Sequence, residues 1–280
     1  MALLAPSYAG AAGLSRQVIE EEITYKAVKG DYLIRIAGKN GVELKVLLSR
    51  NPHEGRYVYP GDTFSITRRT IVPVGTDEGI LINIPDRTLY LFRGGKLEAH
   101  YPVCTGRRGW KTPLGEFKVV HKEKNPTWHV PKNIQREMAR KGERVRTIVK
   151  PGDDNPLGRF AVKTSIDDIL IHETIWPESI YQFRSHGCVR LKPGDAEAFY
   201  NSVSKGDTGS IIYEPVKVAE TTDGRIFLEV QPDPYGSSGD MAALVKKELD
   251  DYGLSGRVDW DKVAEVIKAG DSMAADVTKH

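Results

Sequence analysis

The stretch Ser185-His186-Gly187-Cys188-Val189-Arg190-Leu191 is the most informative part of this 280-residue chain. It places a thiol, an imidazole and a glycine within three residues. A second histidine, His172, lies sixteen residues before Cys188, at the end of an apolar run. A cysteine nucleophile reacts as its thiolate and needs an electropositive setting or a partnered base. The pattern therefore predicts nucleophilic catalysis by Cys188, with His172 as the proton acceptor.

The backbone around the thiol is predicted to stabilise a developing negative charge. The N–H groups of Gly187 and Cys188 can point at an oxyanion, because glycine allows a close approach. Two other interpretations are a buried structural thiol and a zinc site built from His172, His186 and Cys188. The flanking motif argues against the first, and no fourth ligand at metal spacing supports the second. We therefore expect no metal and no cofactor, and we interpret Cys104, which lies in a predicted strand, as a buried inert thiol.

Strand patterns surround this stretch. Residues 80–84 and 88–92 flank Pro85-Asp86-Arg87, which predicts a hairpin from its turn residues. Further strands are predicted over 97–103, 115–121, 160–164, 168–172, 211–218 and 225–230, and a helix over 193–204. The part of the chain from residue 79 onward is therefore predicted to be mainly β.

The residues quoted above resemble the signature of YkuD-type L,D-transpeptidases. That signature is a histidine, a spacer, and then Ser/Thr-His-Gly-Cys, a hydrophobic residue and Asn or Arg. The resemblance covers about residues 79–218 and implies a β-sandwich catalytic domain. Further blocks are similar to the family, and the last two to its periplasmic Gram-negative branch: Val103-Cys104-Thr105-Gly106, Gly109-Trp110-Lys111-Thr112-Pro113-Leu114-Gly115-Glu116-Phe117, Asn125-Pro126-Thr127-Trp128 and Asp154-Asn155-Pro156-Leu157-Gly158.

The resemblance implies a role for each matched residue. Cys188 would be the nucleophile and His172 the general base, oriented by the backbone carbonyl of residue 173. His186 would lie near the oxyanion hole, and Ser185 would buttress the loop. Arg190 would anchor the substrate or the strand.

The implied reaction is acyl transfer on peptidoglycan. The thiol would attack the third residue of a tetrapeptide stem and release D-alanine. The acyl group would pass to an amine of a second stem, giving a 3→3 crosslink, or to a wall-anchored protein. Alternatives are transfer to water, as an L,D-carboxypeptidase or thiol hydrolase, and a non-catalytic wall-binding protein. A β-lactam such as a carbapenem should acylate the same thiol. Because this wall lies outside the cytoplasmic membrane, we expect a periplasmic or exported protein.

Three features near the predicted site have two interpretations. Glu173 stands where the family has glycine or serine. A carboxylate facing the cleft would favour imidazolium and repel acidic stems, whereas one pointing away would have no effect. Trp110 and Trp128 are expected to bind substrate in the cleft or to pack as ordinary aromatic residues. Residues 132–150 hold seven Lys/Arg and two Glu. They are either a solvated helix face and loop or a flap whose cations meet stem carboxylates.

Residues 23–70 are predicted to form a compact unit in the order strand, helix, helix, strand. The unit resembles a LysM module, a fold that binds the glycan of cell walls. The turn at Gly30-Asp31 and the loop from Asn51-Pro52 to Pro60 would bind the glycan strand, unless the module is only a spacer. Its matched residues include Tyr25, Val28, Leu33, Ile36-Ala37, Gly41-Val42, Leu47-Leu48, Pro60-Gly61-Asp62 and Ile66.

The remaining parts complete the predicted organisation. Residues 1–22 are interpreted as a signal-like or disordered tail, 71–78 as a linker, and 219–280 as a C-terminal extension with amphipathic helices over 240–251 and 258–269. The formal net charge, +2, argues against a nucleic-acid binder. No apolar run is long enough for a transmembrane helix. Two cysteines cannot form a disulfide framework.

Overall fold

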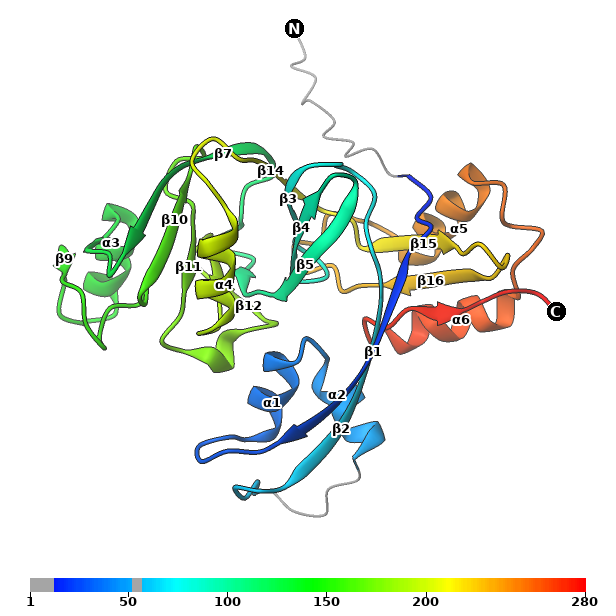
Figure 1. Ribbon diagram of the computed structural model, residues 1–280, viewed down its shortest axis with the longest axis horizontal. Coiled ribbons are helices and arrows are strands. Elements are labelled where there is room, and N and C mark those ends of the chain that lie inside the picture. The colour runs from blue at the N-terminus through cyan, green and yellow to red at the C-terminus, as the bar shows by residue number, and fades with distance from the viewer. Residues whose placement is uncertain (1–12, 52–56) are drawn as a thin grey trace, which may run out of the picture.

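The computed structural model describes residues 13–51 and 57–280. This part of the chain is mainly β and contains six α-helices. Figure 1 shows an N-terminal unit, a central unit around a large sheet, and a C-terminal unit. Pro52 and the first twelve residues of the predicted tail lie outside the described residues. No helix among those described is long and apolar enough to cross a membrane.

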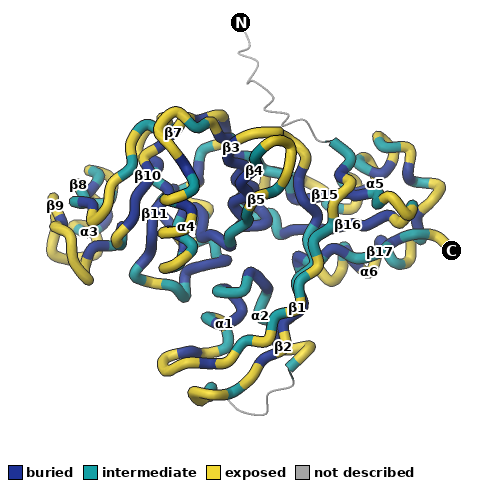
Figure 2. The backbone as a smooth tube through the Cα atoms, in the orientation of Figure 1, coloured by how far each residue is buried: buried dark blue, intermediate teal, exposed yellow. Residues whose placement is uncertain are grey.

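The central unit is built on a mixed sheet of eight strands. Its order is β13-β11-β10-β7-β14-β3-β4-β5. The predicted hairpin is confirmed as antiparallel β3 and β4, which Figure 2 shows as buried. The strands are β3 (Gly79–Asn83), β4 (Thr88–Arg93), β5 (Lys96–Pro102), β7 (Gly115–Lys124), β10 (Phe160–Thr164), β11 (Leu170–Glu173), β13 (Val189–Leu191) and β14 (Thr208–Ile212).

The sheet has two halves, which are joined only through β7. Strand β7 pairs with β14 through residues 115–118 and with β10 through residues 119–124, so the ladder continues from one half to the other. Helix α4 (Asp195–Ser202) lies between the halves (Figure 1). Phe199 of α4 packs edge-on against Tyr101 of β5, and Tyr200 packs against Phe160 of β10. Both halves therefore share one hydrophobic core.

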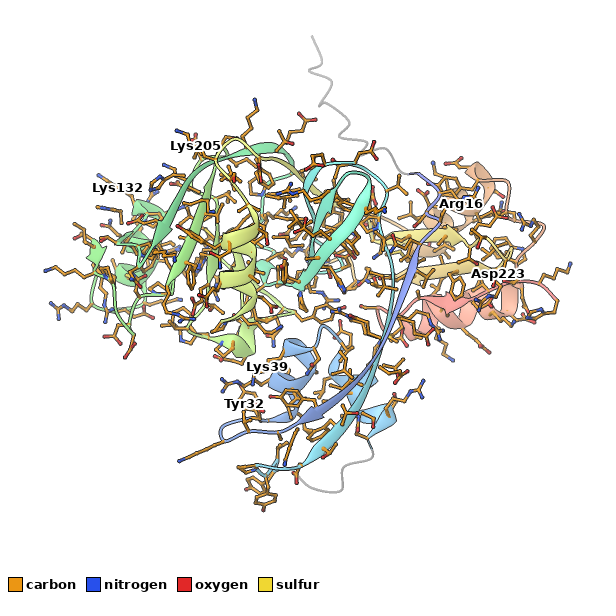
Figure 3. All side chains as sticks on the ribbon, in the orientation of Figure 1. Arg16, Tyr32, Lys39, Lys132, Lys205 and Asp223 are labelled. Carbon is orange, nitrogen blue, oxygen red and sulfur yellow. The ribbon has the colours of Figure 1, made fainter. Side chains whose placement is uncertain are left out.

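Short strands and helices lie in the connections between the strands of the large sheet. Between β7 and β10 the chain forms an excursion that contains helix α3, and the basic segment is therefore partly helical. Lys132, at the start of α3, projects outward in Figure 3. The elements are β6 (Thr105–Gly106), β8 (Trp128–His129), α3 (Lys132–Arg140), β9 (Ile148–Val149), η1 (Pro177–Ser179) and β12 (Phe183–Ser185).

The N-terminal unit has the predicted order: β1 (Val18–Lys26), α1 (Leu33–Lys39), α2 (Leu44–Arg50) and β2 (Thr63–Ile71). The tail predicted over 1–22 is wrong at its end, since residues 18–22 belong to β1 and pair with β2. Three successive glutamates hide the strand pattern in the sequence. In the structure Glu20 and Glu21 form ion pairs across the ladder with Arg69 and Arg68.

The C-terminal unit contains strands as well as the two predicted helices. The helices are confirmed as α5 (Met241–Asp251) and α6 (Trp260–Ala269). They pack on a sheet of β15 (Val216–Glu220), β16 (Ile226–Val230) and β17 (Ala275–Asp276). The single strand predicted over 211–218 is wrong, because β14 and β15 lie in different sheets. Pro215 lies between them and lacks the N–H that a ladder needs.

A buried ion cluster joins the three units. The Lys217 ammonium of β15 lies 2.9 Å from Asp86 in the β3–β4 turn and 3.0 Å from Glu229 of β16. It also donates to the carbonyl of Ile71 at the end of β2, at 2.9 Å. These charges are at most 3% exposed, so each depends on the others for hydrogen bonds.

Candidate active site

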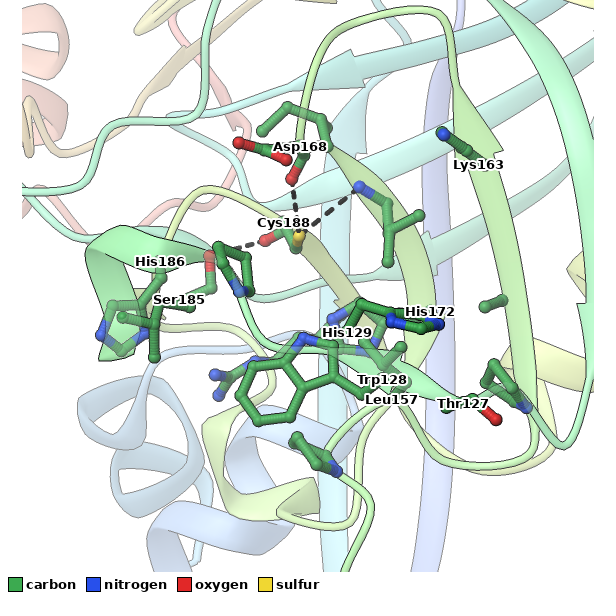
Figure 4. Close-up of a pocket in the computed structure, with 18 of the residues that line it drawn as sticks. Thr127, Trp128, His129, Leu157, Lys163, Asp168, His172, Ser185, His186 and Cys188 are labelled. Carbon is green, nitrogen blue, oxygen red and sulfur yellow. Dashed lines mark hydrogen bonds between the residues drawn. The ribbon is translucent and has the colours of Figure 1, made fainter. Parts of the chain in front are cut away.

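Most of the predicted catalytic residues line one cavity of about 1460 Å³ beside the β10–β11–β13 half of the sheet. Figure 4 shows them converging from separate elements. The cavity is lined by Cys188, His172, Ser185, His186, Arg190 and Trp128, together with residues of the 125–158 excursion. Glu173, Trp110 and Gly187 are not among its lining residues.

His172 is fixed in one tautomer. It lies on β11, opposite Arg190 of the parallel strand β13. Its Nδ1–H donates to the carbonyl oxygen of Glu173 at 2.6 Å, which leaves Nε2 as the unprotonated nitrogen of the neutral ring. Burial, with a smaller effect from the Arg190 cation, lowers the pKa of His172 to about 4. The imidazole is therefore neutral near pH 7 and able to take a proton.

The Cys188 thiol is bound at the β10–β11 turn. Its Sγ accepts from the Leu170 N–H and donates to the Asp168 carbonyl, each at 3.4 Å (Figure 4). Asp168 has φ of 60°, a left-handed conformation that is uncommon for a residue with a side chain. Burial raises the pKa of the thiol. In this state the thiol and the imidazole are therefore both neutral rather than an ion pair.

In the loop over residues 185–188, the two predicted oxyanion donors have different surroundings. Ser185 Oγ donates to the Cys188 carbonyl at 2.6 Å and accepts from the Gly187 N–H at 3.1 Å. The Gly187 amide, predicted to face an oxyanion, is thus already bound to a side chain. The loop can make this turn because Gly187 has φ of +110°, which suits glycine alone. The Cys188 N–H remains as the predicted donor.

Glu137 on α3 was not singled out from the sequence. Its carboxylate accepts from His186 Nε2, from Arg107 and from Lys141, each at 2.8 Å. The hydrogen bonds from Lys141 and Arg107 lower its pKa to about 2. His186, packed edge-on against Trp110 at 4.8 Å between ring centroids, is thereby fixed to the excursion. The contact of Glu137 with His186 joins segments that are far apart in the chain, so no sequence pattern indicated it.

Arg190 lines the cavity, whereas Glu173 does not. The Arg190 guanidinium lies 5.5 Å from the centroid of the Trp176 ring and lines the cavity, where it can bind a carboxylate. Glu173 instead binds Arg159, with Arg159 Nε 3.2 Å from Oε1. Neighbouring residues of a strand point to opposite faces, so the Glu173 carboxylate points away from the imidazole of His172. It therefore does not favour imidazolium.

Two of the residues predicted to bind glycan, Asp31 and Asn51, stabilise the N-terminal unit with their side chains. The Asp31 carboxylate is 1% exposed and binds Lys39 and the Tyr25 hydroxyl, both at 2.6 Å. The Asn51 side chain bonds the backbone of Leu47 and of Ser65. Gly30 is exposed, with φ of +88°. The side chains of Asp31 and Asn51 are therefore engaged within the unit.

The second cysteine, Cys104, does not line the cavity that contains Cys188. Cys104 is fully buried, and its backbone pairs with that of Arg190. Burial raises the pKa of its thiol. Within residues 13–51 and 57–280, no group of three or more His, Cys, Asp or Glu side chains is arranged to hold a metal ion.

Comparison with known proteins identifies relatives of this chain. Residues 77–218 match the YkuD family model, the L,D-transpeptidase catalytic domain. The probable L,D-transpeptidase YcfS of Escherichia coli is 30% identical over 276 residues, 95% of this chain and 86% of YcfS. The probable L,D-transpeptidase YbiS of Escherichia coli is 32% identical over 190 residues, 67% of this chain and 62% of YbiS. A solved L,D-transpeptidase from Mycobacterium smegmatis covers 71% of this chain and 98% of its own, with 18% identity and a TM-score of 0.38.

Proposed function

Because this chain belongs to the L,D-transpeptidase family, we propose that it crosslinks peptidoglycan through a thioester at Cys188. The observation that carries the proposal is the shared cavity, in which a neutral, tautomer-fixed His172 lies with the Cys188 thiol. The alternatives of a stem hydrolase and a silent wall-binding protein have no observation of their own in their favour.

The first half-reaction follows from this arrangement. The thiol leaves the Asp168 carbonyl, and its proton passes to Nε2 of His172 as Sγ bonds to the carbonyl carbon of the third stem residue. The Cys188 N–H binds the oxyanion. Collapse of the intermediate breaks the amide bond, and the proton returns from Nε2 to the leaving amine of D-alanine. Because both groups start neutral, proton transfer accompanies the attack.

The second half-reaction repeats these roles. An amine of another stem gives its proton to Nε2 and attacks the thioester, and the thiol is released in its protonated form. We assign to Arg190, whose guanidinium lines the cavity, the binding of a stem carboxylate. The same steps with the lysine of a protein would anchor that protein to the wall. The test is to incubate the protein with purified tetrapeptide muropeptides and measure the products by mass. A 3→3 dimer with loss of D-alanine is expected, whereas tripeptide alone would indicate transfer to water.

The pH dependence of carbapenem acylation is predicted from His172. The rate should be nearly constant around neutrality and fall in acid with a midpoint near pH 4, the pKa of the imidazole, as the base becomes protonated. Removing the Arg190 cation raises this pKa, so Arg190→Gln should move the midpoint to higher pH. Glu173→Gln should leave it unchanged. Acylation rates measured by intact mass across pH test this, and an acid midpoint near 6.5 in the wild type would contradict it.

The N-terminal unit is proposed to be a LysM module that holds the enzyme on glycan. The support is its strand-helix-helix-strand order and the contact between its turns, where Ala27 and the 61–62 turn exchange backbone hydrogen bonds of 2.8 and 2.9 Å. Val28 and Tyr59 flank this contact and are 55% and 65% exposed. We further propose that residues 23–70, 79–218 and 219–280 act as three parts, with the boundary at 218–219 falling within β15 (Val216–Glu220). The substrate's location supports a periplasmic or exported protein.

Wall binding gives a separate prediction. Val28→Asn with Tyr59→Ser removes two exposed apolar side chains without touching the core. Sedimentation with purified cell wall should weaken severalfold, while acylation by a soluble carbapenem stays the same, because the cavity is unaltered. Unchanged sedimentation of the double variant would argue that these turns are not the glycan site.

A further inference from the structure

Tyr235 belongs to the C-terminal part of the chain but is buried in the catalytic core. It lies between β16 and α5, beyond the end of the family match at residue 218. Its side chain nevertheless joins the hydrophobic core of the central sheet and is 7% exposed. The C-terminal unit therefore reaches into the catalytic part through this residue.

The Tyr235 hydroxyl bridges Gly106 and Thr112, at the two ends of the loop that precedes β7. It accepts from the Thr112 N–H and donates to the Gly106 carbonyl, each at 3.0 Å. The Tyr235 ring stacks on Tyr213, with 5.3 Å between centroids and 24° between planes. The Tyr235 N–H donates to the Tyr213 hydroxyl at 3.0 Å, and that hydroxyl donates to Asp233. Tyr235 is thus fixed at both its ring and its backbone.

Thr112 connects this loop to the catalytic loop. Its Oγ1 accepts from the Gly106 N–H and donates to the Gly187 carbonyl, both at 2.8 Å. The peptide bond is planar and trans, so the Gly187 carbonyl and the Cys188 N–H point in opposite directions from one rigid plane. Holding the carbonyl therefore sets the direction of the N–H, the group left to bind the oxyanion.

We propose that Tyr235 is a positioning residue for the oxyanion hole and acts through Thr112 on the Gly187–Cys188 peptide. The inference rests on the proposed function, in which Cys188 attacks a carbonyl. It gives the C-terminal unit a role in the reaction: residues outside the matched catalytic domain hold the donor that stabilises the transition state.

Two reagents with different chemistry at the same thiol test this role. Meropenem acylation passes through an oxyanion, whereas iodoacetamide alkylates the thiol by displacement and forms none. Tyr235→Phe should slow meropenem acylation by about tenfold, since a misplaced oxyanion donor loses part of its effect. Iodoacetamide alkylation of Cys188, followed by mass of its peptide, should stay within about twofold of wild type.

A second set of variants tests whether Tyr235 acts on the oxyanion donor through Thr112. Thr112→Val removes the link to Gly187 and should slow acylation by about a hundredfold, whereas Thr112→Ser should restore most of the rate. Adding Tyr235→Phe to Thr112→Val should cause little further loss, because both act through one contact. Tyr90→Phe is the matched control: it removes another buried hydroxyl, bound to Asp86 at 3.0 Å in the ion cluster, and should leave acylation unchanged.

These outcomes distinguish the positioning role of Tyr235 from the proposed function of Cys188 as the nucleophile. Selective loss of acylation in Tyr235→Phe supports the positioning role. Wild-type rates with both reagents, or equal loss with both, would overturn it while leaving Cys188 as the nucleophile. A wild-type protein that forms no meropenem adduct at Cys188 would overturn the proposed function and this inference together.

Discussion

Cys188→Ala is expected to abolish turnover of tetrapeptide stems and all carbapenem adduct formation. The thiol supplies the covalent step, and no other described cysteine is accessible, because Cys104 is fully buried. Turnover should fall to less than about a hundredth of wild type, because the loss of a nucleophile costs several orders of magnitude in rate. Product analysis of muropeptides and intact mass after incubation with imipenem or meropenem measure the two losses.

The matched control for this variant is Cys104→Ala. It removes the other thiol and leaves a small cavity, which costs stability but no chemistry. The adduct should form at the wild-type rate in this variant. Residual turnover above a hundredth of wild type in Cys188→Ala, or an adduct that survives there, would show that another group reacts.

Lys217→Met is expected to destabilise the whole fold by about 3–5 kcal/mol, the usual cost of breaking a buried ion pair. The change leaves the Asp86 and Glu229 carboxylates buried without their cation. Burial already raises the pKa of Glu229, and losing Lys217 removes the main factor that lowers it. A carboxyl whose pKa is higher when folded than when unfolded loses stability as pH rises between those two values. The loss should therefore be larger at pH 8 than at pH 5.

Urea unfolding at both pH values measures this effect, with Lys246→Met as the control. Lys246 pairs with Asp250 one turn along α5, and both side chains are about half exposed or more. Exposed pairs of this kind contribute about 0.5 kcal/mol or less. Equal losses in the two variants, or a Lys217→Met loss independent of pH, would contradict the view that the cluster joins the three units.

The sequence by itself predicted the features that depend on neighbouring residues. The spacing of His172 and Cys188 and the turn between β3 and β4 are local patterns, and so are the apolar faces of α5 and α6. The turn and the two helices were found where expected, because a short segment already contains the residues that produce them. The motif also predicted that His172 and Cys188 share a site, and both line the cavity.

Only the tertiary structure decided which distant groups meet. The first residues of β1, 18–22, were assigned to the tail because their glutamates find partners only in the arginines of β2. The direction of Glu173 depends on Arg159, and the Gly187 amide is taken by Ser185 because the loop turns at a positive φ. Hydrogen bonds and ion pairs between distant segments leave no periodic pattern in the sequence. Tyr235, Lys217 and Glu137 therefore acquire their roles only when the chain brings their partners within about 3 Å.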